Sequence, residues 1–208
     1  NPIIESILQS QRYINNLKAI QLELPPRDRI LIYAPHQDDE TLGLGGTIIK
    51  CIEKGKTVKT IYVTNGAAGT KPTNGPALQK IRRKEALEVW SQLGGETPYF
   101  WDLPCRKIPI DNETAAEMAK QIQEFRPEII FVPYFLEKPL DHRNTCKLLI
   151  RANEIKNLNE DIEIWSYQVT SMLTPNVVID ITDYIDEKNK INYMWESQLK
   201  NYNWAHHS

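Results

Sequence analysis

The chain has 208 residues, of which 41% are hydrophobic and 25% charged. These values are near the globular average and exclude a disordered or fibrous protein. The net charge of −2 argues against a nucleic-acid-binding protein, which usually carries a basic excess. No apolar run approaches the roughly 18 residues of a membrane span. The cysteines Cys51, Cys105 and Cys146 form neither a disulfide framework nor a zinc ribbon and favour the cytoplasm. Because the chain begins at Asn1, a removed leader stays open.

Apolar strands and helices are predicted to alternate along the chain. Helical spacing of apolar residues predicts a first helix over residues 3–22. Strands are predicted at 29–34, 58–64, 98–101, 128–133, 162–170 and 177–181, and further helices at 40–54, 77–93, 113–125, 141–154 and 183–204. Strands that alternate with helices are typical of βαβ units. We therefore expect one α/β domain over residues 1–208, a Rossmann-like three-layer α/β/α fold with a mainly parallel sheet.

Two of the four histidines follow predicted strands. His36 lies in PHQDDE, directly after the first buried strand, and His142 lies in PLDHRN, after the strand that ends at Pro133. Ligands of open parallel sheets bind outside the carboxyl ends of the strands. Two imidazoles and one carboxylate leave a position for water, as in catalytic zinc sites, where the metal lowers the pKa of water to about 7. Adjacent Asp38 and Asp39 suit a division in which one binds the metal and the other takes the proton of the water.

A simpler explanation of these acids is helix capping. Asp38, Asp39 and Asp141 each follow a strand, and each alone is explained equally well as a cap of the next helix. Three acids in a row beside His36 are harder to explain in this way, because they would repel one another unless a cation were present.

Several segments together resemble one protein family. PHQDDETLGLGGTI resembles the His-x-Asp-Asp-Glu signature of the PIG-L/LmbE-like de-N-acetylases, which use zinc to hydrolyse the acetamide of N-acetylglucosamine (GlcNAc) conjugates. VTNGAAG, IRRKEALEVWSQLGG, RPEIIFVPYF, DHRNT and PNVVIDITDYIDEKNKINYMWESQ are similar to further segments of the family. The resemblance implies a zinc-dependent de-N-acetylase in which His36, Asp39 and His142 bind the metal and Asp38 is the general base.

The resemblance also implies roles for residues outside the metal set. Arg82 would contact the sugar or its substituent, and Asp102 would bind sugar hydroxyls. Glu40 and Glu85 would brace the loops, and Asp141 would orient the adjacent histidine or cap its helix. The implied substrate is a small molecule or an oligosaccharide of the GlcNAc type, and homo-oligomerisation stays open.

The sequence departs from the family pattern at two positions. Gln37 stands where the family usually has proline, which should leave the ligands in place. Pro139 stands where relatives often have a histidine credited with oxyanion stabilisation or amine protonation. Another group must then take this role, and His206 or His207 is one candidate. The departure also gives weight to a non-catalytic carbohydrate-binding or interaction protein on the same fold.

Two further alternatives concern cofactors. The GLGG stretch at Gly43–Gly46 suggests a dinucleotide site, but a G-x-G-x-x-G match would need glycine where Ile48 stands. Two histidines and a carboxylate also form the facial triad of non-haem iron enzymes. We expect Zn²⁺, while Fe²⁺ or another divalent metal stays open.

Overall fold

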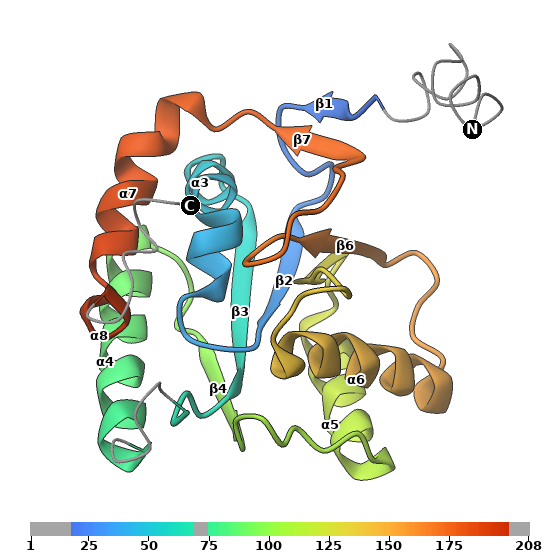
Figure 1. The fold of residues 1–208 in the computed structure, drawn as a ribbon. Coiled ribbons are helices and arrows are strands. Elements are labelled where there is room, and N and C mark those ends of the chain that lie inside the picture. Colours follow the sequence, from blue (N-terminus) through green and yellow to red (C-terminus); the bar gives the residue numbers. More distant parts are fainter. Residues whose placement is uncertain (1–17, 69–74, 200–208) are drawn as a thin grey trace, which may run out of the picture.

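The computed structural model describes residues 18–68 and 75–199. A five-stranded parallel sheet lies at its centre, with helices on both sides (Figure 1). The strand order is β4-β3-β2-β5-β6, and every neighbouring pair is parallel. The strands are β2 (Arg29–Ala34), β3 (Thr57–Thr64), β4 (Tyr99–Leu103), β5 (Ile129–Pro133) and β6 (Glu163–Tyr167). This arrangement confirms the predicted α/β class with a mainly parallel sheet.

Helices cover both faces of this sheet. On one face, side chains of α3 (Asp39–Glu53), α4 (Gly75–Leu93) and α7 (Ile185–Tyr193) form a core with Ile30 and Ile32. On the other face, α5 (Asn112–Phe125) and α6 (Leu140–Lys156) form a core with Leu31 and Tyr33. Consecutive residues of β2 therefore enter opposite cores, which is why this strand reads as a continuous apolar run.

The predicted helix over residues 3–22 is wrong in its last residues. Ile20–Leu22 form β1, which pairs in parallel with β7 (Val177–Ile179) in a separate two-stranded sheet. A short apolar segment fits either a helix or a strand by its spacing, and here the pairing with β7 decides. Residues 3–17 lie outside the described part of the chain.

The predicted helix over residues 183–204 is interrupted. It consists of the 3₁₀ turn η2 (Thr182–Tyr184), α7 and the short α8 (Glu196–Leu199). Trp195 lies between α7 and α8, is buried, and donates from Nε1 to the Thr41 hydroxyl at 2.8 Å. The interruption between α7 and α8 thus coincides with the residue whose indole packs into the core. Residues 200–204, like His206 and His207, lie outside the described residues.

The sheet has its topological switch point between β2 and β5. On one side of β2 lie β3 and then β4. On the other side lie β5 and then β6, so the chain crosses over β2 between β4 and β5. The loops after β2 and β5 therefore meet at the carboxyl edge, where His36 and His142 lie, and this edge is where ligands bind in such sheets. Within the described residues, no helix has the length and apolar character required to cross a membrane.

Candidate functional site

Two histidines and one aspartate converge at the switch point. Asp39 Oδ2 lies 3.2 Å from His36 Nδ1 and 3.2 Å from His142 Nε2. The ligand atoms of the three residues all lie within 4.8 Å of one another. Asp39 and His142 are 4% and 2% exposed, and all three side chains line one cavity. Two imidazole nitrogens and one carboxylate oxygen that face a common space match the three-ligand set of catalytic zinc sites.

Local backbone geometry brings the first two of these side chains together. β2 ends at Ala34 and α3 begins at Asp39, so the connecting loop is short. Asp38 within it has φ 140°, a conformation rare outside glycine, and this abrupt turn starts the helix. The backbone N–H of His36 donates to Asp39 Oδ2 at 2.8 Å, which fixes the carboxylate beside the imidazole.

The second ring nitrogen of His36 contacts another acid. His36 Nε2 lies 3.1 Å from Asp141 Oδ2, and the Arg106 backbone N–H donates to both oxygens of Asp141 at 2.8 and 2.9 Å. Of the two expectations for Asp141, orientation of His142 or capping of its helix, neither describes these contacts, since the acid faces His36 and the N-cap residue of α6 is Pro139. Consecutive residues of a helix point about 100° apart, so Asp141 and His142 at the start of α6 face different partners. A proton on Nε2 of His36 leaves Nδ1 free for a metal.

A second group of possible ligands overlaps the first. His36, Cys105 and Asp141 also have ligand atoms within 4.8 Å of one another. The Cys105 thiol, however, is within hydrogen-bonding distance of Thr64 Oγ1 at 3.2 Å and Asn65 Oδ1 at 3.3 Å. The set centred on Asp39 is therefore the better metal site, because one carboxylate oxygen lies against both imidazoles.

Asp38 does not act as a helix cap through its side chain. It occupies the N-cap position of α3, yet its carboxylate makes no cap hydrogen bond, and it lines the same cavity as the ligand set. Burial raises the pKa of Asp38 to about 7, and the charge of Asp39 acts in the same direction. A carboxyl group that titrates near neutral pH in a cavity can both accept and return a proton.

His36 and Asp39 also have shifted pKa values, and both shifts arise from the charges of their neighbours. Burial lowers the pKa of His36, but the carboxylates of Asp39 and Asp141 outweigh this effect and raise it to about 10. Burial raises the pKa of Asp39, but the two histidines hold it well below its usual range. The site thus favours positive charge.

Arg82 lies in the cavity and contacts the C-terminal part of the chain. Its guanidinium donates from Nη2 to Gln198 Oε1 of α8, and both residues line the cavity. Glu85, one turn further along α4, accepts bonds from the N–H and the hydroxyl of Ser197 at 2.8 and 2.6 Å. Glu85 thus braces α8, whereas the prediction was that it braces the loops. The sequence contained a signal for Gln198, because it belongs to the Ser-Gln pair of the last family-like segment.

Two predicted residues lie outside the cavity lining. Asp102 is exposed, has φ 61°, and pairs with Arg83 of α4, so its predicted contact with sugar hydroxyls stays a prediction. Glu40 is fully buried and accepts from the Tyr62 hydroxyl and from Trp90 Nε1, the latter at 3.3 Å. Burial raises the pKa of Glu40 to about 8. Its contacts connect α3 with β3 and α4 rather than with a loop, so its predicted bracing of the loops stays a prediction.

The two departures from the family pattern have distinct surroundings. Gln37 donates from Nε2 to the Thr64 carbonyl at 2.9 Å and leaves the ligand set intact. Gly66 has φ +64°, and a Cβ there would lie 2.1 Å from Gln37 Oε1, so only glycine fits beside this side chain. Pro139 occupies the N-cap position of α6 and lines the cavity, where it offers no titratable group.

The GLGG stretch serves helix packing. Gly43 and Gly46 lie on α3, where a Cβ would come within 2.5 Å of Tyr167 Cδ2 and 2.6 Å of Ile181 Cδ1, respectively. The glycines let α3 approach the end of β6 and the chain that follows β7. This geometry agrees with the rejection of a dinucleotide site.

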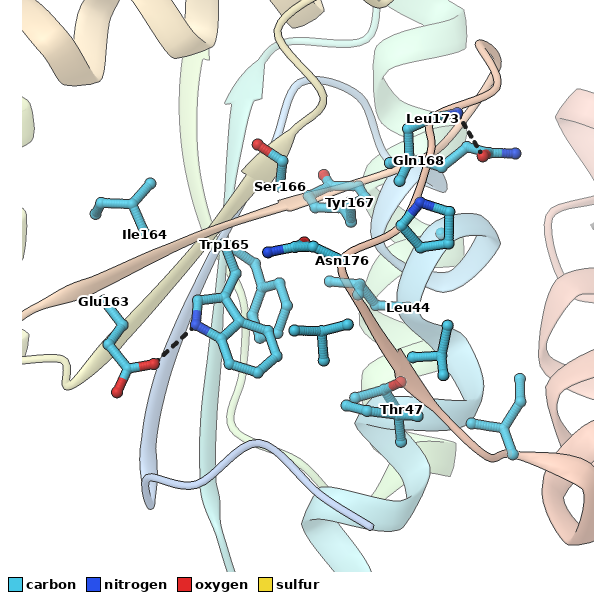
Figure 2. A pocket seen from close by; sticks show the side chains of 17 residues that line it. Leu44, Thr47, Glu163, Ile164, Trp165, Ser166, Tyr167, Gln168, Leu173 and Asn176 are labelled. Carbon is cyan, nitrogen blue, oxygen red and sulfur yellow. Dashed lines mark hydrogen bonds between the residues drawn. The ribbon is translucent and has the colours of Figure 1, made fainter. Parts of the chain in front are cut away.

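A second, larger cavity lies beside the candidate site. The ligand set faces a cavity of about 180 Å³, which Val169 and Thr170 also line. Gln168 lines the neighbouring cavity of about 700 Å³, between α3, β6 and β7. Figure 2 shows Trp165 and Leu44 at this larger cavity, with Glu163 bonded to the indole nitrogen at 2.9 Å. Neither group of potential metal ligands in the described chain lies there, so chemistry rather than volume identifies the site.

Comparisons with known proteins identify the family of the chain. The sequence matches the PIG-L family, described as GlcNAc-PI de-N-acetylase, over residues 31–153. It is 28% identical over 192 residues to the diacetylchitobiose deacetylase of Thermococcus kodakarensis, which covers 85% of this chain and 72% of that protein.

Two further relatives extend the comparison. The chain is 26% identical over 153 residues to the 1D-myo-inositol 2-acetamido-2-deoxy-alpha-D-glucopyranoside deacetylase of Mycobacterium sp. strain KMS, covering 61% of this chain and 49% of that protein. The chain thus spans about half the length of this relative. The fold matches the N,N'-diacetylchitobiose deacetylase of Pyrococcus horikoshii with a TM-score of 0.73 and 26% identity, covering 95% of this chain and 79% of that one.

Proposed function

Because the chain belongs to the PIG-L family, we propose that it is a metal-dependent hydrolase that removes the N-acetyl group from a GlcNAc-containing small molecule or oligosaccharide. The observation that carries the proposal is the position of Asp39 between two imidazoles, with the uncapped carboxylate of Asp38 in the same cavity. The printed names of the archaeal and mycobacterial relatives describe deacetylases of GlcNAc-type substrates and support this substrate class.

The donor set fits Zn²⁺. His36 Nδ1, His142 Nε2 and Asp39 Oδ2 would hold it, and these are three ligands of the type that catalytic zinc takes. A divalent ion bound there supplies a Lewis acid for the acetamide carbonyl and lowers the pKa of water. Fe²⁺ takes the same two-histidine, one-carboxylate set, so metal content has to be measured.

Asp38 is the proposed general base. Water adds to the acetamide carbonyl carbon as Asp38 accepts one of its protons, and the C–N bond breaks as Asp38 returns that proton to the leaving nitrogen. The products are acetate and a free amine. The carboxylate of Asp38 lines the same cavity as the ligand set and makes no cap hydrogen bond, so it is free to carry a proton from the water to the leaving nitrogen. One residue thereby performs the protonation for which relatives often keep a histidine at the position of Pro139.

Arg82 is the proposed substrate-binding residue. Its guanidinium lies in the cavity and contacts Gln198, so both polar groups can meet a sugar hydroxyl or a substituent of the sugar. The cavity beside the ligand set is small, and we infer that it receives the acetamide and the adjoining part of the sugar ring. The group attached to the sugar then extends outside.

A direct test measures amine release and metal content together. The purified chain is loaded with zinc and incubated with diacetylchitobiose or with GlcNAc-inositol, and free amine is quantified. We expect turnover by the wild type and a loss of kcat of about 10²- to 10⁴-fold in Asp38→Asn, with the metal retained. Asp161→Asn is the matched control. It makes the same substitution at an exposed acid that does not line the cavity, and it should retain full turnover.

Two results would contradict the proposal. Retained turnover of Asp38→Asn would remove Asp38 from the base role. Sugar binding by the zinc-loaded wild type without amine release from either substrate would favour the alternative, a non-catalytic carbohydrate-binding protein, which the proline at position 139 suggests.

A further inference from the structure

A buried glutamate next to the candidate site has no role in the proposal so far. Glu137 lies in the loop between β5 and α6 and is 0% exposed. Its carboxylate accepts from three consecutive backbone N–H groups, those of Val169 at 2.7 Å, Thr170 at 2.9 Å and Ser171 at 3.0 Å. It also accepts from the Thr170 hydroxyl. Such a set of donors stabilises the ionised form and fixes the carboxylate in place.

The same carboxylate faces a proposed metal ligand. Glu137 Oε2 lies 3.9 Å from Nδ1 of His142. That nitrogen is buried and has no hydrogen-bond partner among the residues that the structure describes, while Nε2 of the same ring faces Asp39. An unpaired buried nitrogen is costly. The Glu137 carboxylate is the acid that faces this nitrogen.

The two histidines therefore have parallel surroundings. One nitrogen of each ring faces Asp39 Oδ2, and the other faces a second acid, Asp141 for His36 and Glu137 for His142. Metal-binding histidines commonly donate their other N–H to a carboxylate, which fixes the tautomer and the orientation of the ring. Asp141 is already within hydrogen-bonding distance, whereas Glu137 is not.

We propose that Glu137 is a positioning residue with two effects on the site. It keeps the proton of His142 on Nδ1, so that Nε2 offers its lone pair to the metal. It also holds the Val169–Ser171 segment against the cavity, where Val169 and Thr170 form part of the wall that a substrate meets. This inference rests on the proposed metal site.

The two effects can be separated by two variants. Glu137→Gln keeps the size of the side chain but removes the charge that faces His142 and part of the acceptor capacity for the segment. Thr170→Val removes only the hydroxyl donor and leaves the carboxylate facing His142. A role limited to packing would leave the ring tautomer and the metal affinity unchanged in both variants.

The test measures zinc affinity by competition with a chromophoric chelator, and kcat and KM by amine release. We expect the zinc dissociation constant of Glu137→Gln to rise about 10- to 100-fold over that of the wild type. For Thr170→Val we expect a dissociation constant within about twofold of wild type and a raised KM. Equal zinc affinity of Glu137→Gln and wild type would overturn the first effect, and an unchanged KM of Thr170→Val would overturn the second.

A third measurement, by NMR, is made on the wild type and therefore does not depend on the folding of a variant. In the zinc-loaded wild type with ¹⁵N-labelled histidine, long-range ¹H–¹⁵N spectra report which ring nitrogen carries the proton. We expect His142 to carry it on Nδ1, and a proton on Nε2 would overturn the inference. A wild type that binds no zinc would overturn the proposed metal site and this inference with it, whereas zinc binding that Glu137→Gln leaves unchanged would overturn the metal-positioning effect alone.

Discussion

The cavity beside His36 measures about 180 Å³ and the cavity beside Trp165 about 700 Å³, and both adjoin α3 and the chain that follows β6. The smaller one contains two imidazoles, a carboxylate between them and a second carboxylate whose pKa is raised to about 7. The larger one is lined by separate polar groups and by apolar side chains such as Leu44. Convergent titratable groups therefore locate the chemistry where volume alone would point elsewhere.

A position at the switch point explains this difference. The small cavity lies above the carboxyl ends of β2 and β5, so loops from both halves of the sheet contribute to it. The large cavity lies along β6, the edge strand, and receives side chains from α3 and β7. Metal removal and three sets of substitutions test whether amine release depends on the smaller cavity and not on the larger one.

Metal removal should have the largest effect. Dialysis against a chelator is expected to abolish amine release, and added zinc should restore it, because the proposed mechanism needs a cation at the ligand set to act on the acetamide. Activity and metal content are measured on the same sample. Full turnover by metal-free protein would contradict the proposed mechanism.

His142→Ala comes next. We expect this variant to lose at least about 100-fold in zinc affinity, since one of three ligands is removed and Asp39 loses an imidazole neighbour. Chelator competition measures the effect, with circular dichroism to check the fold. Unchanged zinc binding would point to a different third ligand.

Gly66→Ala should give a moderate effect. Both Gly66 and Gly94 have positive φ, but a Cβ at Gly94 would meet nothing within 4 Å, whereas one at Gly66 would press on Gln37. We expect Gly94→Ala to lower the free energy of unfolding by about 1–2 kcal/mol. Gly66→Ala should lower it further and also weaken zinc binding, since Gln37 adjoins His36. Urea denaturation and chelator competition measure both, and identical results for the two variants would contradict the account of Gly66.

A bulky side chain in the larger cavity should have the smallest effect. Ser166→Trp places an indole where Ser166 now lines that cavity. We expect kcat/KM within about twofold of wild type, because the ligand set lies in the other cavity. A large rise in KM would show that the substrate extends into the space beside Trp165.

Much of the fold could be predicted because buried strands and amphipathic helices leave clear patterns. β2 was predicted with its exact bounds, and α3 within one residue at each end. The first and last predicted helices failed because their limits depend on partners distant in sequence. Ile20–Leu22 pair with β7, and Trp195 packs against Thr41. Spacing along the chain contains no information on either contact.

The candidate site was predictable to a similar degree. A histidine and two acids directly after a buried strand indicated a ligand set, since strand ends of a parallel sheet meet at one edge. Which acid would support which histidine was not predictable, because Asp141 contacts a residue 105 positions away. Glu137 was missed for the same reason. Its partners at 169–171 follow a different strand.

The backbone of Asp38 has a consequence for the stability of the whole chain. Its φ of 140° is one that glycine adopts freely and that costs other residues about 1–3 kcal/mol. The carboxylate makes no cap bond that would offset this strain. Folding and the proposed proton transfer therefore make opposite demands on position 38, where the residue best suited to the turn would have no group to move a proton.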